Sequence, residues 1–287
     1  MKYLVFGLIG YPLKHSFSPY IHNAAFKHLK IKAKYQLFPL QENELKGFFA
    51  NLKKENVRGL NVTIPYKEKV LEILEGRKDK AVEAIGATNT ILVDEKGGLN
   101  FFNTDYLGFL RHLETLNIRP KKIAIIGAGG ASRAICFALG KKKAKEVWLY
   151  DIARFRSQEL AQRFNYLFPA TKFQAVNNIS GLRIKDKDLL INASPVGMSS
   201  TDPLLVNSRM LHSGLFVYDL IYNPYETKLL KLAREADLGY ANGLGMLLYQ
   251  AVESFDIWFG KKKAPLEIMQ KALSKVLEKK IKKERKW

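Results

Sequence analysis

Lys122-Ile-Ala-Ile-Ile-Gly-Ala-Gly-Gly-Ala-Ser-Arg-Ala134 is the stretch of this 287-residue chain that decides its fold. Its first five residues predict a β-strand, the glycines predict a turn, and the residues after them predict a helix. Glu146–Tyr150 predicts the next strand, which ends at Asp151. A strand, a glycine-rich turn, a helix and a second strand form the opening of a Rossmann-like dinucleotide-binding domain.

The glycine-rich turn predicts a pyrophosphate site. Gly127, Gly129 and Gly130 allow a close approach to the backbone, and the following helix offers free N–H groups at its positive end. The third glycine of the strict pattern is replaced by Ser132, although Ala134 is small. An ordinary tight turn between a strand and a helix is the alternative.

Asp151 lies 24 residues after Gly127, at the end of the next predicted strand. An acidic side chain at this place accepts hydrogen bonds from ribose hydroxyls, which favours NAD and repels the 2′-phosphate of NADP. Arg154 and Arg156 are close enough in sequence to compensate for that repulsion. A solvated turn residue is the alternative role for Asp151.

The residues before this domain alternate between strand and helix patterns, which predicts a largely parallel sheet covered by helices. Strands are predicted at Tyr3–Ile9, Lys34–Phe38 and Val57–Ile64, and helices at Pro19–Leu29, Glu42–Lys54 and Pro65–Leu74. Thr88–Val93 and Leu99–Asn103 flank a glycine turn and predict a β-hairpin.

The rest of the chain completes a two-domain α/β protein. Further strands are predicted at Asp188–Asn192 and Leu215–Leu220, and helices at Leu107–Leu116, Met246–Phe259 and the C-terminus. We expect an N-terminal α/β substrate domain of residues 1–105, completed by residues 243–287, and a Rossmann-like domain of residues 106–242. We expect the active site in the cleft between the two domains.

The composition is that of a globular protein in water, with 47% hydrophobic and 26% charged residues. No apolar run is long enough to span a bilayer. The single cysteine, Cys136, predicts a buried thiol and excludes a disulfide framework or a cysteine-based metal site. Met1–Gly10 lacks the small-residue cleavage site of a signal peptide, so we expect a first strand there and a cytoplasmic protein.

The net charge of +20 can mark a nucleic-acid-binding protein or an attraction for anionic ligands. The lysines are scattered, and the run at Lys279–Lys286 belongs to a predicted helix with apolar residues at helical spacing. We interpret the charge as solvated helix faces whose field also favours anionic substrates.

Two further pairs of residues carry polar chemistry. Ser16 and Ser18 stand at alternate positions, where two hydroxyls suit a ligand carboxylate; Ser18 before Pro19 is equally a good helix N-cap. Lys67 lies in the predicted helix that begins at Pro65, and Asp105 follows a predicted strand. A lysine and an aspartate brought together hold a substrate hydroxyl and move its proton, which beside a hydride carrier indicates a dehydrogenase.

The chain resembles the shikimate dehydrogenase family along nearly its whole length. The motifs that carry the resemblance are Ile9–Pro19 with His22-Asn23, Asn61–Lys67, Gly86–Thr90, Asn103-Thr-Asp105-x-x-Gly108, the glycine loop, Ile191–Met198, Asp219–Pro224 and Gly243-x-Gly-Met246-x-x-x-Gln250. His15 lies within the first motif, either as a catalytic base or as a structural histidine. Eight motifs in the same order make the match specific.

The resemblance implies a role for each site residue. Lys67 is implied as the acid/base group, with Asp105 beside it. The residues implied to bind the carboxylate and the ring hydroxyls of the substrate are Ser16, Ser18, Thr63, Lys67, Asn89, Asp105, Tyr222 and Gln250. The residues implied to contact the cofactor are Asp79, Gly127, Ala128, Gly129, Gly130, Ala131, Asp151, Arg154, Arg156, Leu220 and Gly243.

One departure concerns the cofactor. The family's usual segment after the second strand of this domain carries Asn-Arg-Thr, whose arginine meets the 2′-phosphate of NADP. The same place here is Asp151-Ile152-Ala153, whereas Arg156 keeps the family's later arginine. The family favours NADP, and these three residues favour NAD or the use of both.

The resemblance implies reversible, NAD(P)H-dependent reduction of 3-dehydroshikimate to shikimate in aromatic amino-acid biosynthesis. The close alternative is a catabolic quinate/shikimate dehydrogenase that prefers NAD. A non-catalytic, nucleic-acid-binding relative is an alternative of another class, suggested by the charge alone. We expect small-molecule partners, no nucleic acid or membrane, and a monomer or a homodimer.

Overall fold

The structure is a computed structural model that describes residues 3–13, 16–260 and 263–284. The chain divides into two compact units. The first unit consists of Met1–Gly108 and Leu247–Trp287, and the second of Phe109–Met246. The chain passes from one unit to the other within two helices, α5 (Asp105–Thr115) and α9 (Leu244–Phe259).

The first unit contains a six-stranded sheet with the order β2-β1-β3-β5-β6-β4. Its strands are β1 (Leu4–Gly10), β2 (Ala33–Pro39), β3 (Val57–Val62), β4 (Arg77–Lys78), β5 (Thr90–Val93) and β6 (Leu99–Phe102). β1 pairs in parallel with β2 and β3, whereas β5 is antiparallel to both β3 and β6. The predicted β-hairpin is therefore confirmed, and it makes this sheet mixed.

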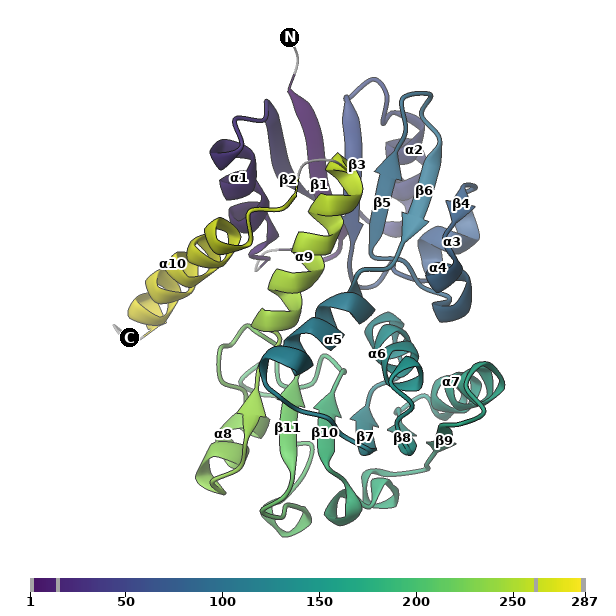
Figure 1. Ribbon diagram of the computed structural model, residues 1–287, viewed down its shortest axis with the longest axis vertical. Coiled ribbons are helices and arrows are strands. Elements are labelled where there is room, and N and C mark those ends of the chain that lie inside the picture. The colour runs from purple at the N-terminus through teal and green to yellow at the C-terminus, as the bar shows by residue number, and fades with distance from the viewer. Residues whose placement is uncertain (1–2, 14–15, 261–262, 285–287) are drawn as a thin grey trace. The chain divides into compact units, whose positions relative to one another are not determined.

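Successive residues of a strand point to opposite faces of the sheet. In this sheet both faces carry apolar side chains, and helices cover both. Val5 packs in a core with residues of α2 (Leu45–Ala50), α3 (Lys69–Ile73) and α4 (Lys80–Ile85). The neighbouring Phe6 contacts Phe26 of α1 (Ser18–His28) and Trp258 of α9. Figure 1 shows α9 crossing this face of the sheet and α10 (Leu266–Glu284) beside α1.

Two helix predictions for this unit were wrong, and one helix was missed. The helix predicted at Glu42–Lys54 is a 3₁₀ turn (Glu42–Glu44) followed by the short α2, and α4 was not predicted. The helix predicted to start at Pro65 starts at Lys69. The reason is a turn around Ile64 and Pro65, closed by the Tyr66 N–H donating to the Thr63 carbonyl at 2.9 Å.

The second unit contains a six-stranded, all-parallel sheet with the order β12-β11-β10-β7-β8-β9. Its strands are β7 (Lys122–Ile126), β8 (Glu146–Tyr150), β9 (Lys172–Ala175), β10 (Leu189–Asn192), β11 (Phe216–Asp219) and β12 (Tyr240–Ala241). Its helices include α6 (Gly130–Lys141), α7 (Arg154–Leu167) and α8 (Lys228–Glu235). The α/β fold and the bounds predicted for β7 and β8 are confirmed, whereas β9 and α7 were not predicted.

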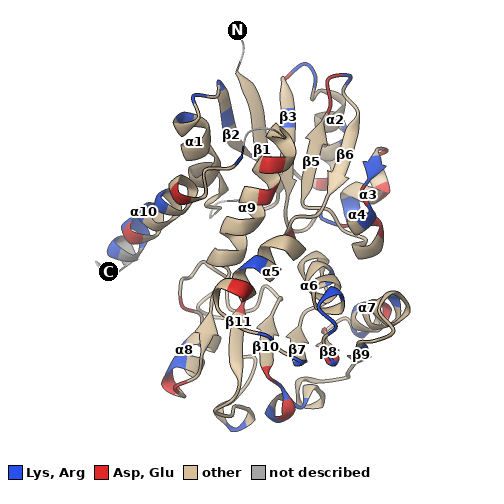
Figure 2. Cartoon of the chain, viewed as in Figure 1, with Lys and Arg blue, Asp and Glu red and all other residues tan. Residues whose placement is uncertain are grey.

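Cys136 is fully buried in α6, as predicted for a structural thiol. Lys and Arg occur on helices of both units, including α6 and α10 (Figure 2). In the described part of the chain, none of the helices combines the length and the apolar character needed to cross a membrane.

We predict opposite effects for two glycine-to-alanine substitutions in the first unit. A Cβ at Gly59 of β3 would lie 2.5 Å from Nε1 of Trp258, whose ring is fixed by its hydrogen bond to the Ile91 carbonyl. Gly59→Ala is therefore expected to lower the free energy of unfolding by about 1–3 kcal/mol.

Gly47→Ala is the matched control, because Gly47 lies in α2 and a Cβ there meets no atom within 4 Å. It is expected to raise the free energy of unfolding by up to about 1 kcal/mol. Urea unfolding of both variants measures the difference, and equal stabilities would contradict the packing described here.

Candidate active site

Lys67 and Asp105 form an ion pair in the first unit, with 2.5 Å between Nζ and Oδ2. Their side chains are 14% and 6% exposed. Lys67 follows the turn at Pro65, and its carbonyl accepts the Thr88 N–H at 2.8 Å. Asp105 is the first residue of α5, where the positive end of the helix dipole stabilises a carboxylate. The backbone of each residue is therefore held in place, which fixes the point from which each charged side chain extends.

The carboxamide of Asn89 holds the second oxygen of Asp105. Its Nδ2 donates to Asp105 Oδ1 at 2.9 Å, and it lies 3.2 Å from Oε1 of Gln250 on α9. Its Oδ1 accepts the Thr104 N–H at 2.6 Å. Asn89 is only 2% exposed and Gln250 8%. Four residues implied by the family resemblance therefore lie together: Lys67, Asn89, Asp105 and Gln250.

A second layer of buried polar side chains supports Asn89. The Asn61 Nδ2 donates to the Asn89 carbonyl at 3.1 Å and to Ser254 Oγ at 3.0 Å. The Ser254 hydroxyl also contacts the hydroxyls of Thr90 and Thr104, at 2.8 and 3.0 Å. Leaving one such buried group unpaired costs about 1–3 kcal/mol, so this layer fixes Asn89 in one orientation.

The roles of Thr90, Thr104 and Ser254 were missed in the sequence. Thr90 and Thr104 stand inside the motifs that carry the resemblance, directly after Asn89 and directly before Asp105. Ser254 follows Gln250 by four residues in a predicted helix, which places both side chains on one face. This four-residue spacing is the sequence signal that could have indicated a role for Ser254.

Ser16 and Ser18 also lie together, because the Ser18 N–H donates to Ser16 Oγ at 3.3 Å. The proposed N-cap role of Ser18 is wrong: α1 begins at Ser18, and its N-cap is Phe17, whose carbonyl accepts the Tyr20 N–H at 3.0 Å. Pro19 is consequently the second residue of the helix. Thr63 is half-buried, and its N–H donates to the Ile9 carbonyl at 2.9 Å. His15 lies outside the described residues.

The glycine loop of the second unit has the geometry of a backbone cradle. Gly127 has a φ of +102°, and a Cβ there would lie 2.8 Å from the backbone of Ala193 and Ser194. Gly129 is the N-cap of α6, and a Cβ there meets no atom within 4 Å. The Ser132 hydroxyl donates to the Gly127 carbonyl at 2.7 Å, which gives the residue in place of the third glycine a structural role.

Asp151 joins this loop to the start of α7. Its two carboxylate oxygens accept the backbone N–H groups of Ala128 and Ala153, at 2.7 and 2.8 Å. Arg154 is exposed and Arg156 half-buried in the first turn of α7. Ile152 is 94% exposed. The carboxylate therefore has an internal structural role that the solvated-turn alternative does not include.

The remaining predicted site residues are Leu220 and Gly243 for the cofactor, Tyr222 for the substrate and Asp79 for the cofactor. Gly243 lies against Leu220, since a Cβ on it would come within 2.0 Å of the Leu220 carbonyl oxygen. Tyr222 is half-buried in the loop that follows β11. Asp79 belongs to the first unit and caps α4, where its Oδ1 accepts the Val82 N–H at 2.7 Å and burial raises its pKa.

Asp219 ties together the loops that follow β10 and β11. Its carboxylate accepts hydrogen bonds from Asn192 Nδ2, the Ile221 N–H and the Thr227 hydroxyl, at 3.0, 3.0 and 2.7 Å. Burial raises the pKa of Asp219 to about 6, and the three donors oppose that rise without cancelling it. These contacts fix the loop that contains Leu220 and Tyr222.

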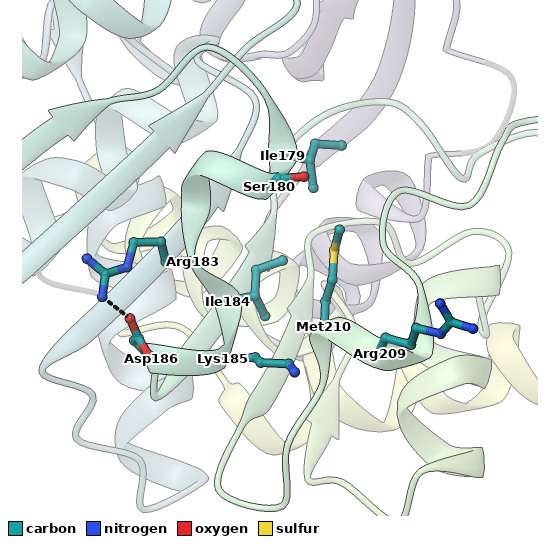
Figure 3. Close-up of a pocket in the computed structure, with 8 residues that line it drawn as sticks. All are labelled: Ile179, Ser180, Arg183, Ile184, Lys185, Asp186, Arg209 and Met210. Atoms are coloured by element: carbon teal, nitrogen blue, oxygen red, sulfur yellow. Dashed lines mark ion pairs between the residues drawn. The ribbon is translucent and has the colours of Figure 1, made fainter.

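A surface cavity of about 320 Å³ lies elsewhere in the second unit. It is lined by Ile179, Ser180, Arg183, Ile184, Lys185, Asp186, Arg209 and Met210. Figure 3 shows Arg183 paired with Asp186 and directed away from Arg209. Its residues precede β10 and β11, whereas ligands of parallel sheets bind beyond the carboxyl ends of the strands. None of the predicted site residues lines this cavity.

The raised pKa of Asp219 predicts a pH dependence of stability. A carboxyl group whose pKa is higher in the folded state stabilises the fold below its unfolded pKa, here 3.8, and this contribution is lost as the pH rises through about 6. Between pH 4 and pH 7 the free energy of unfolding should fall by about 1–3 kcal/mol more in the wild type than in Asp219→Asn. Urea unfolding at both pH values tests this; identical pH dependence in the two proteins would refute it.

Two domain families match the chain. The shikimate dehydrogenase substrate binding domain matches residues 8–91, and the shikimate 5′-dehydrogenase C-terminal domain matches residues 243–273. A shikimate dehydrogenase (NADP(+)) of Methanobrevibacter smithii is 39% identical over 96% of this chain and 97% of its own length.

Two solved structures of shikimate dehydrogenases are also similar to this chain. The crystal structure of shikimate dehydrogenase from Aquifex aeolicus has a TM-score of 0.85 at 36% identity, covering 94% of this chain and 97% of its own. Shikimate 5-dehydrogenase from Listeria monocytogenes, in complex with shikimate and NAD, has a TM-score of 0.83 at 32% identity and covers 94% and 96%. On these matches and the motifs shared along its whole length, the chain belongs to the shikimate dehydrogenase family.

Proposed function

We propose that this chain is a shikimate dehydrogenase, an NAD(P)-dependent oxidoreductase that reversibly reduces 3-dehydroshikimate to shikimate in aromatic amino-acid biosynthesis. Membership of the family supports the reaction. The observation that carries the proposal for this chain is the buried pair of Lys67 and Asp105, held by Asn89. An acid/base group, its counter-charge and an amide are thereby gathered in one place.

The first unit is proposed to bind the substrate. Ser16 and Ser18 would hold its carboxylate, since both hydroxyls lie at the start of α1. The ring hydroxyls would be held by Thr63, Asn89, Asp105 and Gln250, and Tyr222 is proposed as a further substrate contact. Amide and carboxylate side chains offer both donors and acceptors, which suits a ring that carries several hydroxyls.

Lys67 is proposed to move the proton. When the alcohol is oxidised, its hydroxyl proton passes to the Lys67 amine as the C–H hydrogen leaves as hydride; in the reduction, the Lys67 ammonium returns the proton to the oxygen. Asp105 stabilises the ammonium form and orients Nζ. The nicotinamide cofactor, when bound, accepts or supplies the hydride.

The second unit is proposed to bind the cofactor. The positive φ of Gly127 and the open space at Gly129 fit a dinucleotide pyrophosphate above the N-terminus of α6. The residues proposed to hold it are Gly127, Ala128, Gly129, Gly130 and Ala131, with Leu220 and Gly243 at the nicotinamide end. Asp79, which caps α4, is proposed as a further cofactor contact.

NADP is the cofactor named for the curated relative, and NAD is the one described in the Listeria complex. We propose that this chain accepts both. Asp151 places a negative charge beside the adenosine ribose, and Ile152 stands where the family has an arginine. Arg154 and Arg156 supply the positive charge that a 2′-phosphate needs.

We further propose a cytoplasmic enzyme that acts as a monomer or a homodimer on small molecules, without nucleic acid or membrane. Quinate turnover distinguishes it from a catabolic quinate/shikimate dehydrogenase.

Lys67→Ala is predicted to lower kcat for shikimate oxidation by about 10²–10⁴-fold, the usual contribution of general acid–base catalysis, with only a modest change in shikimate affinity. Steady-state kinetics and shikimate titration measure the two effects. Lys69→Ala is the control, because Lys69 lies two residues away and its side chain, 37% exposed, pairs with Glu42 and Glu72. Turnover of Lys67→Ala within a few-fold of the wild type would exclude the assigned role.

The ratio of kcat/KM for NADP⁺ to that for NAD⁺ tests the cofactor proposal. Values within about tenfold of each other are expected for the wild type, a difference of about 1.4 kcal/mol in transition-state binding. Asp151→Asn should raise the ratio, because it removes the charge that repels a 2′-phosphate. If Asp151→Asn also loosens the glycine loop, it weakens the binding of both cofactors alike, and this effect cancels in the ratio. A strong wild-type preference for NADP⁺ would show that Arg154 or Arg156 overrides Asp151.

A further inference from the structure

Tyr218 is a completely buried tyrosine on β11 whose hydroxyl meets His112 of α5. The distance between the Tyr218 oxygen and Nδ1 of His112 is 2.6 Å. The Tyr218 ring packs edge-on against His112 and against Phe109, with centroids 5.5 Å apart in both pairs. A strand and a helix of the second unit are thus joined through one hydroxyl.

Burial lowers the pKa of His112 to about 4, so the ring is neutral near pH 7. A neutral imidazole has one N–H donor and one acceptor nitrogen. In the tautomer that carries its proton on Nε2, Nδ1 accepts the phenol proton of Tyr218.

The His112 ring also lies against the backbone of α9. A Cβ at Gly245 would come within 2.2 Å of Cδ2 and Nε2 of His112, so only glycine allows this contact. On the other side of the same turn, Asn242 Oδ1 accepts the Leu244 N–H at 3.1 Å, and the Gly243 N–H donates to the Ile221 carbonyl at 3.2 Å. The segment from Asn242 to Gly245 is therefore held by hydrogen bonds at one end and by the His112 ring at the other.

We propose that His112 and Tyr218 are positioning residues for hydride transfer, because they hold the first turn of α9 and, with it, Gly243 at the nicotinamide end of the cofactor site. This inference rests on the proposed function. Gly243 is pressed against the Leu220 carbonyl, so a shift of the turn moves both residues. A misplacement of about 1 Å at a reacting centre can cost on the order of 10²-fold in rate.

Three variants test the proposal in the full-length enzyme with shikimate and NADP⁺. Tyr218→Phe removes the hydroxyl and keeps the ring, and His112→Leu removes the hydrogen-bond partner of that hydroxyl. Both are expected to lower kcat by about 5- to 50-fold, to leave the KM for shikimate within about twofold, and to raise the deuterium isotope effect on hydride transfer, as misplacement predicts. His112→Asn, whose Oδ1 can take the place of Nδ1, should recover most of the loss.

Thr171→Val is the control, since it removes another buried hydroxyl from the second unit, directly before β9 and at the opposite edge of the sheet from β12. It should leave kcat and the isotope effect unchanged. If Tyr218→Phe does not fold, His112→Leu and His112→Asn decide alone, because His112 is only half-buried.

The inference is overturned if folded His112→Leu keeps the wild-type kcat and isotope effect, if His112→Asn gives no recovery, or if Thr171→Val shows the same loss. A wild-type enzyme without shikimate oxidation would instead overturn the proposed function, so the two failures are distinguishable.

Discussion

The buried carboxamide of Asn89 is the interaction on which the substrate site depends. A carboxamide has a fixed number of donors and acceptors, and at 2% exposure these must be paired within the protein. Here they bind the start of α5 at Thr104 and Asp105 and reach Gln250 of α9. Because Asp105 is held at one oxygen, its other oxygen is directed at Lys67. The hydrogen bonds of the Asn89 carboxamide therefore fix the position of the ion pair.

The second unit uses the same principle with carboxylates. Asp151 fixes the glycine loop to the first turn of α7, and Asp219 fixes the loops after β10 and β11. In each case a charged group at the end of a strand accepts backbone or amide donors that a loop would otherwise leave unpaired. A loop held in this way presents a preorganised backbone, which is the requirement for binding a dinucleotide without a large ordering cost.

Patterns of local origin could be predicted from the sequence, whereas features set by tertiary contacts could not. The strands β7 and β8 and the hairpin of β5 and β6 were predicted because apolar runs and glycine turns are local signals. The helix at Pro65 was predicted wrongly, because a turn closed by Thr63 and Tyr66 precedes it. The cap role of Ser18 failed because α1 already includes Ser18 and has Phe17 as its N-cap. Asn61 and Ser254 are 193 positions apart, and the spacing of Ser254 from Gln250 places it on the site face of a helix without indicating that Asn61 is its partner.

The pair held by Asn89 is the proposed proton-transfer centre, and a crystal structure with bound shikimate is the sharpest test of that role. We expect one ring hydroxyl within about 2.6–3.2 Å of Lys67 Nζ, the range required for proton transfer, and the substrate carboxylate at Ser16 and Ser18. An ordered shikimate bound in an active crystal without contact to Lys67 or Asp105 would contradict the claim.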